Sequence, residues 1–200
     1  MKTGILLLPL AIALPAAAQK APPTPAQPAV AASAPAAPGG PVENGAIKGL
    51  AFPWNRAKDL LVRAAEKMPE ENYAFKPAPD VRSFGQLVGH VADANFIFSA
   101  MALGEKPEPR GIEKTKTSKA DLVAALKESF AACEKVFAMS DADLSVAMQL
   151  FGRDTTRFGL VGLMVGHNWE HYGNLVTYMR IKGLVPPSSE PRPGAPAPPK

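Results

Sequence analysis

Four stretches of the chain, all within residues 45–185, carry apolar side chains at every third or fourth position. This spacing lines one face of a helix, so it predicts amphipathic helices. The first stretch ends before Met68-Pro69, and Pro53 either begins its regular part or bends it. No stretch shows the alternation of apolar and polar residues that predicts a strand. The pattern therefore predicts an all-α fold, and four helices of about five or six turns favour a four-helix bundle.

Capping signals mark where these helices begin and end. Ser83 and Ser118 each precede a helix and are followed three residues later by a side chain that can complete a capping box. The last helix begins at Thr155 or Thr156, whose hydroxyl groups can accept a hydrogen bond from its first turn. Gly183 fits the left-handed position that follows the end of that helix.

The connectors leave the order of the helices around the core open. The first two connectors span about a dozen residues each, which does not force consecutive helices to lie side by side. Residues 140–144 suggest one further helical turn before the last helix. Four glycines at helical spacing predict a smooth face of the last helix to which another helix can pack closely. They are Gly159, Gly162, Gly166 and Gly173.

The two ends of the chain differ in composition from this helical block. Residues 1–18 begin with Met-Lys, continue with an apolar run and end in three alanines, which is typical of a secretory signal peptide. The run is shorter than the roughly 20 residues of a membrane span. Residues 19–44 and 186–200 hold fourteen of the twenty-two prolines, and we expect both to be disordered Pro/Ala-rich tails. The sequence therefore predicts an exported protein, periplasmic or secreted after cleavage near Ala18, with one domain over residues 45–185.

Charge and cysteine content narrow the class of protein further. The formal net charge of +4 is spread along the chain without a basic cluster, so we expect no nucleic-acid partner. The single cysteine, Cys133, excludes an intrachain disulfide. Its helical neighbours are apolar, which favours a buried side chain over a reactive thiol. Stability must therefore come from the packing of the helices.

The three histidines of the chain all fall in its most apolar helical stretches. His167 and His171 are four residues apart, so on a helix they lie on one face about 5–6 Å apart. His90 lies in the second predicted helix. Three imidazoles with an open fourth position form the ligand set of a catalytic zinc site, which lowers the pKa of bound water to near neutral. We interpret His90, His167 and His171 as ligands of a divalent transition metal, zinc first, with nickel or iron as alternatives.

Two carboxylates are candidates for chemistry beside these histidines. Asp93 lies one turn after the first histidine, and Glu170 directly precedes the last. Either can act as a general base or accept a hydrogen bond from a ligand imidazole. The alternative interpretation, in which the histidines are ordinary core residues, predicts no metal. The pattern His167-x-x-Glu170-His171 also occurs in inverted zinc peptidases, but these need a further acidic ligand and the next acid is Glu190 in the tail.

Several segments resemble the DinB-like proteins of the DinB/YfiT superfamily. The matching segments are Met68 to Glu71, Phe75 to Pro77, Val81 to His90 and Gly166 to Pro187. The resemblance covers about residues 46–188. It implies a four-helix bundle with a divalent metal held by the three histidines, and it implies frequent homodimers. The sequence departs from the family pattern at Asn174, where Gln is common, and at Tyr172, where a basic residue is frequent.

The resemblance and the histidines together support two functions. Family members with assigned activities include thiol-dependent transferases and an isomerase, so one hypothesis is a metal-dependent transferase or hydrolase of a small molecule. Export counts against a thiol cofactor, because such thiols are mainly cytoplasmic. The alternative is a noncatalytic metal- or ligand-binding module on the same bundle. A pocket lined by Asp93 or Glu170 favours the enzyme, whereas a site covered by aromatic residues such as Trp169 or Phe98 favours the module.

Overall fold

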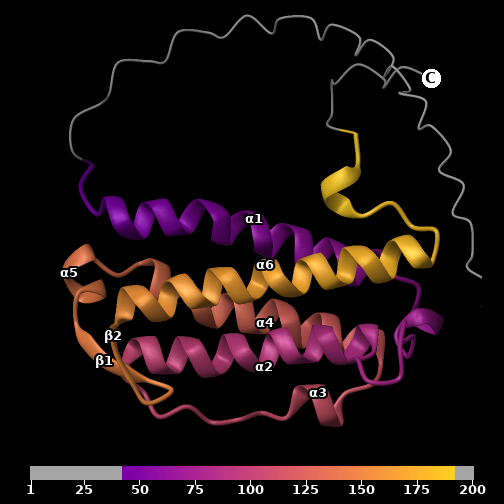
Figure 1. Cartoon of the computed structure of the whole chain (residues 1–200), viewed down its shortest axis with the longest axis horizontal. Coiled ribbons are helices and arrows are strands. Elements are labelled where there is room, and N and C mark those ends of the chain that lie inside the picture. The colour runs from indigo at the N-terminus through magenta and orange to yellow at the C-terminus, as the bar shows by residue number, and fades with distance from the viewer. Residues whose placement is uncertain (1–41, 192–200) are drawn as a thin grey trace, which may run out of the picture. The chain divides into compact units, whose positions relative to one another are not determined.

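The computed structural model describes residues 42–191, so the predicted signal peptide and most of both predicted tails lie outside the described residues. Four long helices dominate this part of the chain and pack side by side (Figure 1). They are α1 (Gly45–Lys67), α2 (Phe84–Leu103), α4 (Lys119–Phe137) and α6 (Arg157–Ile181). The predicted four-helix bundle is confirmed. Among residues 42–191, no helix combines the length and apolar character that a membrane span requires.

The order of the helices around the core places the histidine-bearing helices together. Helix α1 packs mainly against α4 and α6, and α2 packs against the same two helices. The consecutive helices α1 and α2 therefore occupy opposite corners of the bundle, an arrangement that their long connector permits. Helices α2 and α6, which carry all three histidines, are direct neighbours (Figure 1).

Each long helix contributes fully buried side chains to one continuous core. Leu61 of α1, Val91 of α2, Leu126 of α4 and Leu175 of α6 have no exposed surface. Burial of an apolar side chain of this size stabilises the fold by roughly 1.5–3 kcal/mol relative to exposure. Cys133 of α4 belongs to the same core, and burial raises the pKa of its thiol to about 12. The prediction that the Cys133 side chain is buried is confirmed.

The predicted capping signals are largely present. The Ser83 hydroxyl accepts from the backbone N–H of Gln86, whose side chain accepts from the Ser83 N–H, so the capping box is complete. The Ser118 hydroxyl accepts from the backbone N–H of Asp121, but the Asp121 carboxylate accepts from that hydroxyl and not from the Ser118 N–H, so the second capping box is incomplete. Gly183 follows α6 with a φ of 72°, the left-handed conformation expected there. Thr156 stands at the N-cap of α6, but its side chain makes no capping hydrogen bond.

A β-hairpin before α6 corrects the prediction that the chain contains no strand. Strands β1 (Ala147–Leu150) and β2 (Arg153–Thr156) pair antiparallel, and a two-residue turn joins them. Both turn residues, Phe151 and Gly152, have positive φ, at 49° and 74°. Such turns normally carry Asn, Asp or Gly at the first position, so phenylalanine gave no signal of a hairpin. The predicted extra turn at residues 140–144 is present as α5 (Asp141–Leu144).

The predicted close approach of a helix to the glycines of α6 is wrong for the described chain. A Cβ atom added at Gly162, Gly166 or Gly173 would meet nothing within 4 Å, because these positions lie on the outer side of the helix. A Cβ at Gly159 would collide with the Thr155 hydroxyl of the preceding strand, not with another helix. The glycine that does allow a close approach is Gly89 of α2.

Gly89 admits a short helix, α3 (Ile112–Thr115), that the sequence pattern did not predict. A Cβ at Gly89 would lie only 2.8 Å from the Cα of Glu113. One turn further along α2, the two carboxylate oxygens of Asp93 accept hydrogen bonds from the backbone N–H groups of Ile112 and Glu113, at 3.0 and 2.9 Å. The missing side chain at Gly89 therefore lets α3 approach α2, and the hydrogen bonds to Asp93 hold it there.

The ordered structure continues past the predicted domain boundary at residue 185. After the short 3-10 turn η1 (Glu70–Asn72) between α1 and α2, a second one, η2 (Pro187–Ser189), follows α6. Its backbone N–H at Ser188 donates to the hydroxyl of Tyr172 at 2.9 Å. Glu190 forms ion pairs with Arg63 and Lys67 of α1. The first residues of the predicted tail are thus attached to α1 and α6.

The close approach at Gly89 yields a test with a matched control. We expect Gly89→Ala to lower the free energy of unfolding by about 1–3 kcal/mol, because the methyl group overlaps the backbone of Glu113. Gly162→Ala adds the same methyl group to open space on α6, and we expect it to raise the free energy of unfolding by up to roughly 1 kcal/mol. Urea titration followed by circular dichroism measures both values. Equal effects of the two substitutions would contradict the assigned contact.

Candidate metal centre

The three histidines meet between α2 and α6. The Nε2 atom of His167 lies 3.2 Å from Nε2 of His90 and 3.0 Å from Nε2 of His171. Ligand nitrogens of all three lie within 4.8 Å of one another. The helical spacing on α6 aims two imidazoles at one point, and the packing of α2 against α6 brings the third. We call these residues the histidine cluster.

Helix α3 supplies an outer hydrogen bond to the cluster. Oε2 of Glu113 lies 3.1 Å from Nδ1 of His90. A carboxylate accepts hydrogen bonds only, so Nδ1 of His90 carries the proton and donates it, and Nε2 keeps its lone pair. The sequence analysis missed Glu113, because it lies in a polar connector 23 residues from His90 and nothing local marks it. Its proximity arises only from the docking of α3 on α2.

The other two imidazoles differ in their outer contacts. Nδ1 of His171 lies 3.3 Å from the side-chain amide of Asn174. Turning that amide by 180° places its oxygen where it accepts the Nδ1 proton, which again leaves Nε2 as a lone-pair donor. Nδ1 of His167 is buried and has no hydrogen-bond partner among residues 42–191. Neighbouring Asn168 is fully buried too, and its amide donates to Asn95 at 2.9 Å.

Burial keeps two of the histidines uncharged. Loss of solvent is the largest cause that lowers the pKa of His167 and of His171, in each case to about 4. The nearby histidines and the positive charge of Arg82 lower both values further. These two side chains are therefore neutral at pH 7, which is the form of imidazole that binds metals.

The donor set and its spacing fit a divalent transition metal. Two ligands of a tetrahedral zinc ion with bonds of about 2.0–2.1 Å lie about 3.3 Å apart. The measured Nε2 separations of 3.0 and 3.2 Å are close to this value. A neutral His167 has one N–H, so at most one of these two contacts is a full hydrogen bond, whereas a cation among the three nitrogens would accept a lone pair from each ring. The Cys133 sulfur is not available as a ligand, because it is buried and its S–H donates to the carbonyl of Asn95.

The two predicted carboxylates occupy different places. Both oxygens of Asp93 accept from the backbone of α3, so Asp93 supports Glu113 and forms no hydrogen bond to a histidine within residues 42–191. Glu170 is exposed and lines a hollow beside the cluster. Glu190, the acid that a peptidase of the inverted type would need, pairs with Arg63 and Lys67 of α1 instead.

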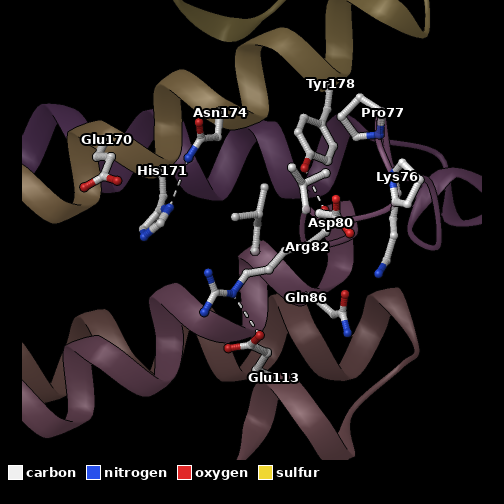
Figure 2. A pocket seen from close by; sticks show the side chains of 13 residues that line it. Lys76, Pro77, Asp80, Arg82, Gln86, Glu113, Glu170, His171, Asn174 and Tyr178 are labelled. Carbon is white, nitrogen blue, oxygen red and sulfur yellow. Dashed lines mark hydrogen bonds and ion pairs between the residues drawn. The ribbon is translucent and has the colours of Figure 1, made fainter.

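The hollow opens directly onto one histidine of the cluster (Figure 2). It has a volume of about 630 Å³ and lies between the C-terminal half of α6, the start of α2 and the loop that precedes α2. Charged side chains line it together with apolar ones. The residues that border it and also contact the cluster or its partners are Arg82, Glu113, His171 and Asn174.

Aromatic residues border the cluster on other sides. The ring of Phe98 meets that of His167 edge to face, with 5.6 Å between the centroids. Trp169 points toward α1, where its Nε1 donates to the carbonyl of Pro53 at 3.1 Å. Pro53 lies inside α1, and its backbone carbonyl is the group that accepts the indole hydrogen bond. Trp169 does not line the hollow, so the open side of the cluster is bordered by Glu170.

Comparison with known proteins agrees with this fold. A curated relative, the uncharacterized protein YjoA of Bacillus subtilis (strain 168), is 28% identical over 129 residues, which is 63% of this chain and 84% of YjoA. A crystal structure of a DinB-like protein from Bacillus cereus ATCC 10987 has a TM-score of 0.62 and 19% identity, over 70% of this chain and 95% of that one. The crystal structure of the DinB-like protein YjoA has a TM-score of 0.55 and 24% identity, over 68% and 92%.

The family assignment rests on the sequence model of the family. The model of the DinB superfamily matches residues 54–175, which is more than half of the chain. The match includes all three members of the histidine cluster. The solved structures share the fold, in keeping with that match. The chain therefore belongs to the DinB superfamily.

Proposed function

We propose that the protein holds a divalent transition metal at the histidine cluster and is a metal-dependent enzyme that acts on a small molecule in the adjoining hollow. The observation that carries the proposal is the convergence of three Nε2 atoms from two helices, with separations of 3.0 and 3.2 Å. A neutral His167 has a single N–H, so hydrogen bonding among the rings accounts for at most one of the two contacts. Their arrangement is explained by a cation that accepts all three lone pairs.

Each residue around the cluster has a distinct task in this proposal. His90, His167 and His171 hold the metal, which when bound supplies a Lewis acid and activates a coordinated oxygen or sulfur nucleophile. Glu113 fixes the tautomer of His90 by accepting its Nδ1 proton. Glu170 borders the open side of the cluster, where it can accept a proton from a molecule in the hollow or donate one to it.

The donor set and the predicted location favour one metal and one reaction class. Three imidazoles without a thiolate suit zinc first, and they also suit nickel or iron. Export, which we propose from residues 1–18, favours a hydrolase over a thiol transferase, since small thiols are mainly cytoplasmic. A noncatalytic binding module on the same bundle is the alternative. The hollow beside His171 favours the enzyme, because it is lined by Glu170, and a proton acceptor there serves turnover and is not needed to bind a metal or a ligand.

Metal binding tests the cluster directly. We expect the tag-free protein, purified without chelators, to bind one equivalent of zinc in equilibrium dialysis. His90→Ala, His167→Ala and His171→Ala should each weaken binding at least about 100-fold, because each removes a ligand. Glu113→Gln should weaken it roughly 10–100-fold through the loss of the acceptor at Nδ1 of His90.

The control for the last variant is Glu128→Gln, which removes another carboxylate that is paired with an arginine on the surface. We expect it to leave the affinity for zinc unchanged. Absence of zinc binding by the wild-type protein would refute the metal site. An unchanged affinity in any one histidine variant would remove that residue from the set of ligands.

Turnover separates the enzyme from the binding module. We expect a screen of small esters, amides and phosphoesters to find hydrolysis by the zinc-loaded wild-type protein that is lost in His167→Ala. Glu170→Gln should bind zinc like the wild type but lower kcat by roughly 10²–10⁴-fold, since the proton acceptor is gone. Hydrolysis that persists in His167→Ala would contradict the proposal, and zinc binding without any turnover would support the module.

A further inference from the structure

Arg82 is held at two points beside the histidine cluster. It lies in the loop before α2, directly ahead of the capping residue Ser83. Its backbone carbonyl accepts from the hydroxyl of Tyr178 on α6 at 2.6 Å. Its side-chain Nε donates to Oε1 of Glu113 at 2.9 Å. The contact with α6 therefore positions the backbone of Arg82, the ion pair with α3 orients its guanidinium group, and Figure 2 shows that group between Glu113 and His171.

Glu113 couples Arg82 to the cluster. Its two carboxylate oxygens are divided between Nε of Arg82 and Nδ1 of His90. The position of the guanidinium relative to the metal-binding nitrogens is thus set by one side chain. The position of Glu113 depends in turn on the hydrogen bonds from the α3 backbone to Asp93 and on the close approach of that backbone to Gly89.

Most of the hydrogen-bonding capacity of Arg82 is unused. A guanidinium group has five N–H donors, and the pair with Glu113 uses the one on Nε. The four donors on Nη1 and Nη2 have no partner among residues 42–191. The side chain is 43% exposed and borders the hollow. A planar pair of N–H donors is thus available there for a carboxylate or another oxyanion.

The net charge of the hollow favours a ligand that carries a single negative charge. The charged side chains that line it are two cations, Lys76 and Arg82, and three carboxylates, Asp80, Glu113 and Glu170, which give a net charge of −1. A divalent metal on neutral imidazoles would change this to +1. A monoanion balances the loaded site, whereas a dianion adds repulsion from the three carboxylates.

The remaining wall of the hollow is apolar. Leu87, Val81 and the ring of Tyr178 lie along it, with two prolines of the loop before α2. The volume of about 630 Å³ is within the usual range for small-molecule sites. This combination suits a small organic molecule with an apolar body and one charged end.

We propose that the substrate of this site is a small organic monoanion, a carboxylate in the first instance, whose charged end binds the free Nη edge of Arg82 while its reacting group faces His171. The inference rests on the proposed function, since it names the class of molecule on which the metal centre acts. Arg82 is then a specificity-determining residue. It selects anions over neutral molecules of the same shape.

Binding of carboxylates and of their amides tests the assignment. The probes are butyrate and benzoate, compared with butyramide and benzamide, in calorimetric titration of the zinc-loaded full chain. We expect the carboxylates to bind at least about tenfold more tightly than the amides, because only a carboxylate forms a charge-assisted, two-bond pair with the guanidinium group. Arg82→Gln should abolish that preference, and Arg82→Lys should retain part of it.

The control is Arg153→Gln, which removes the same charge from β2, away from the hollow. It should leave the preference intact. A wild-type protein that does not prefer either carboxylate, or a preference that survives Arg82→Gln, would overturn the inference while leaving the metal site standing. Loss of zinc from Arg82→Gln along with the preference would also overturn it, because Arg82 would then act only through Glu113 on His90. Failure of the wild type to bind zinc would instead refute the proposed function.

Discussion

The packing of α2 against α6 brings three imidazoles together, with Nε2 of His167 at 3.2 Å from that of His90 and 3.0 Å from that of His171, and the rest of the site is arranged around this contact. Burial keeps His167 and His171 neutral at pH 7. The single N–H of a neutral His167 can satisfy only one of its two ring neighbours, and its buried Nδ1 has no partner among residues 42–191, so apolar residues of similar size would fill the space better. The contact therefore makes physical sense as a binding site for a cation, formed by helices that the hydrophobic core already holds in place.

A second layer orients this contact and extends it toward the hollow. Gly89 lets the backbone of α3 approach α2, and Asp93 caps α3 at the point of approach. Both features position the Glu113 side chain between His90 and Arg82. One carboxylate thereby fixes a metal-binding imidazole and a guanidinium group at the same time. In our proposal, affinity for the metal and selection of an anion therefore both depend on this side chain.

The parts of this arrangement that were predictable from the sequence are those that depend on local spacing. Four-residue spacing placed His167 and His171 on one face, and the signals at Ser83, Ser118 and Gly183 marked helix ends that the structure confirms. Glu113 could not be found in this way, because its role depends on a tertiary contact across 23 residues. The β-hairpin was missed because Phe151 occupies a turn position that normally carries Asn, Asp or Gly. The glycines of α6 were misinterpreted, since spacing shows that they share a face but not which way that face points.

The central claim is that three imidazoles from α2 and α6 hold one metal ion. X-ray absorption spectroscopy of the zinc-loaded protein tests it most directly, because multiple scattering from imidazole rings reports the number of histidine ligands. We expect three imidazole nitrogens with further oxygen ligands at about 2.0–2.1 Å and no sulfur. A zinc environment with fewer than three imidazoles, or with a sulfur ligand from Cys133, would contradict it.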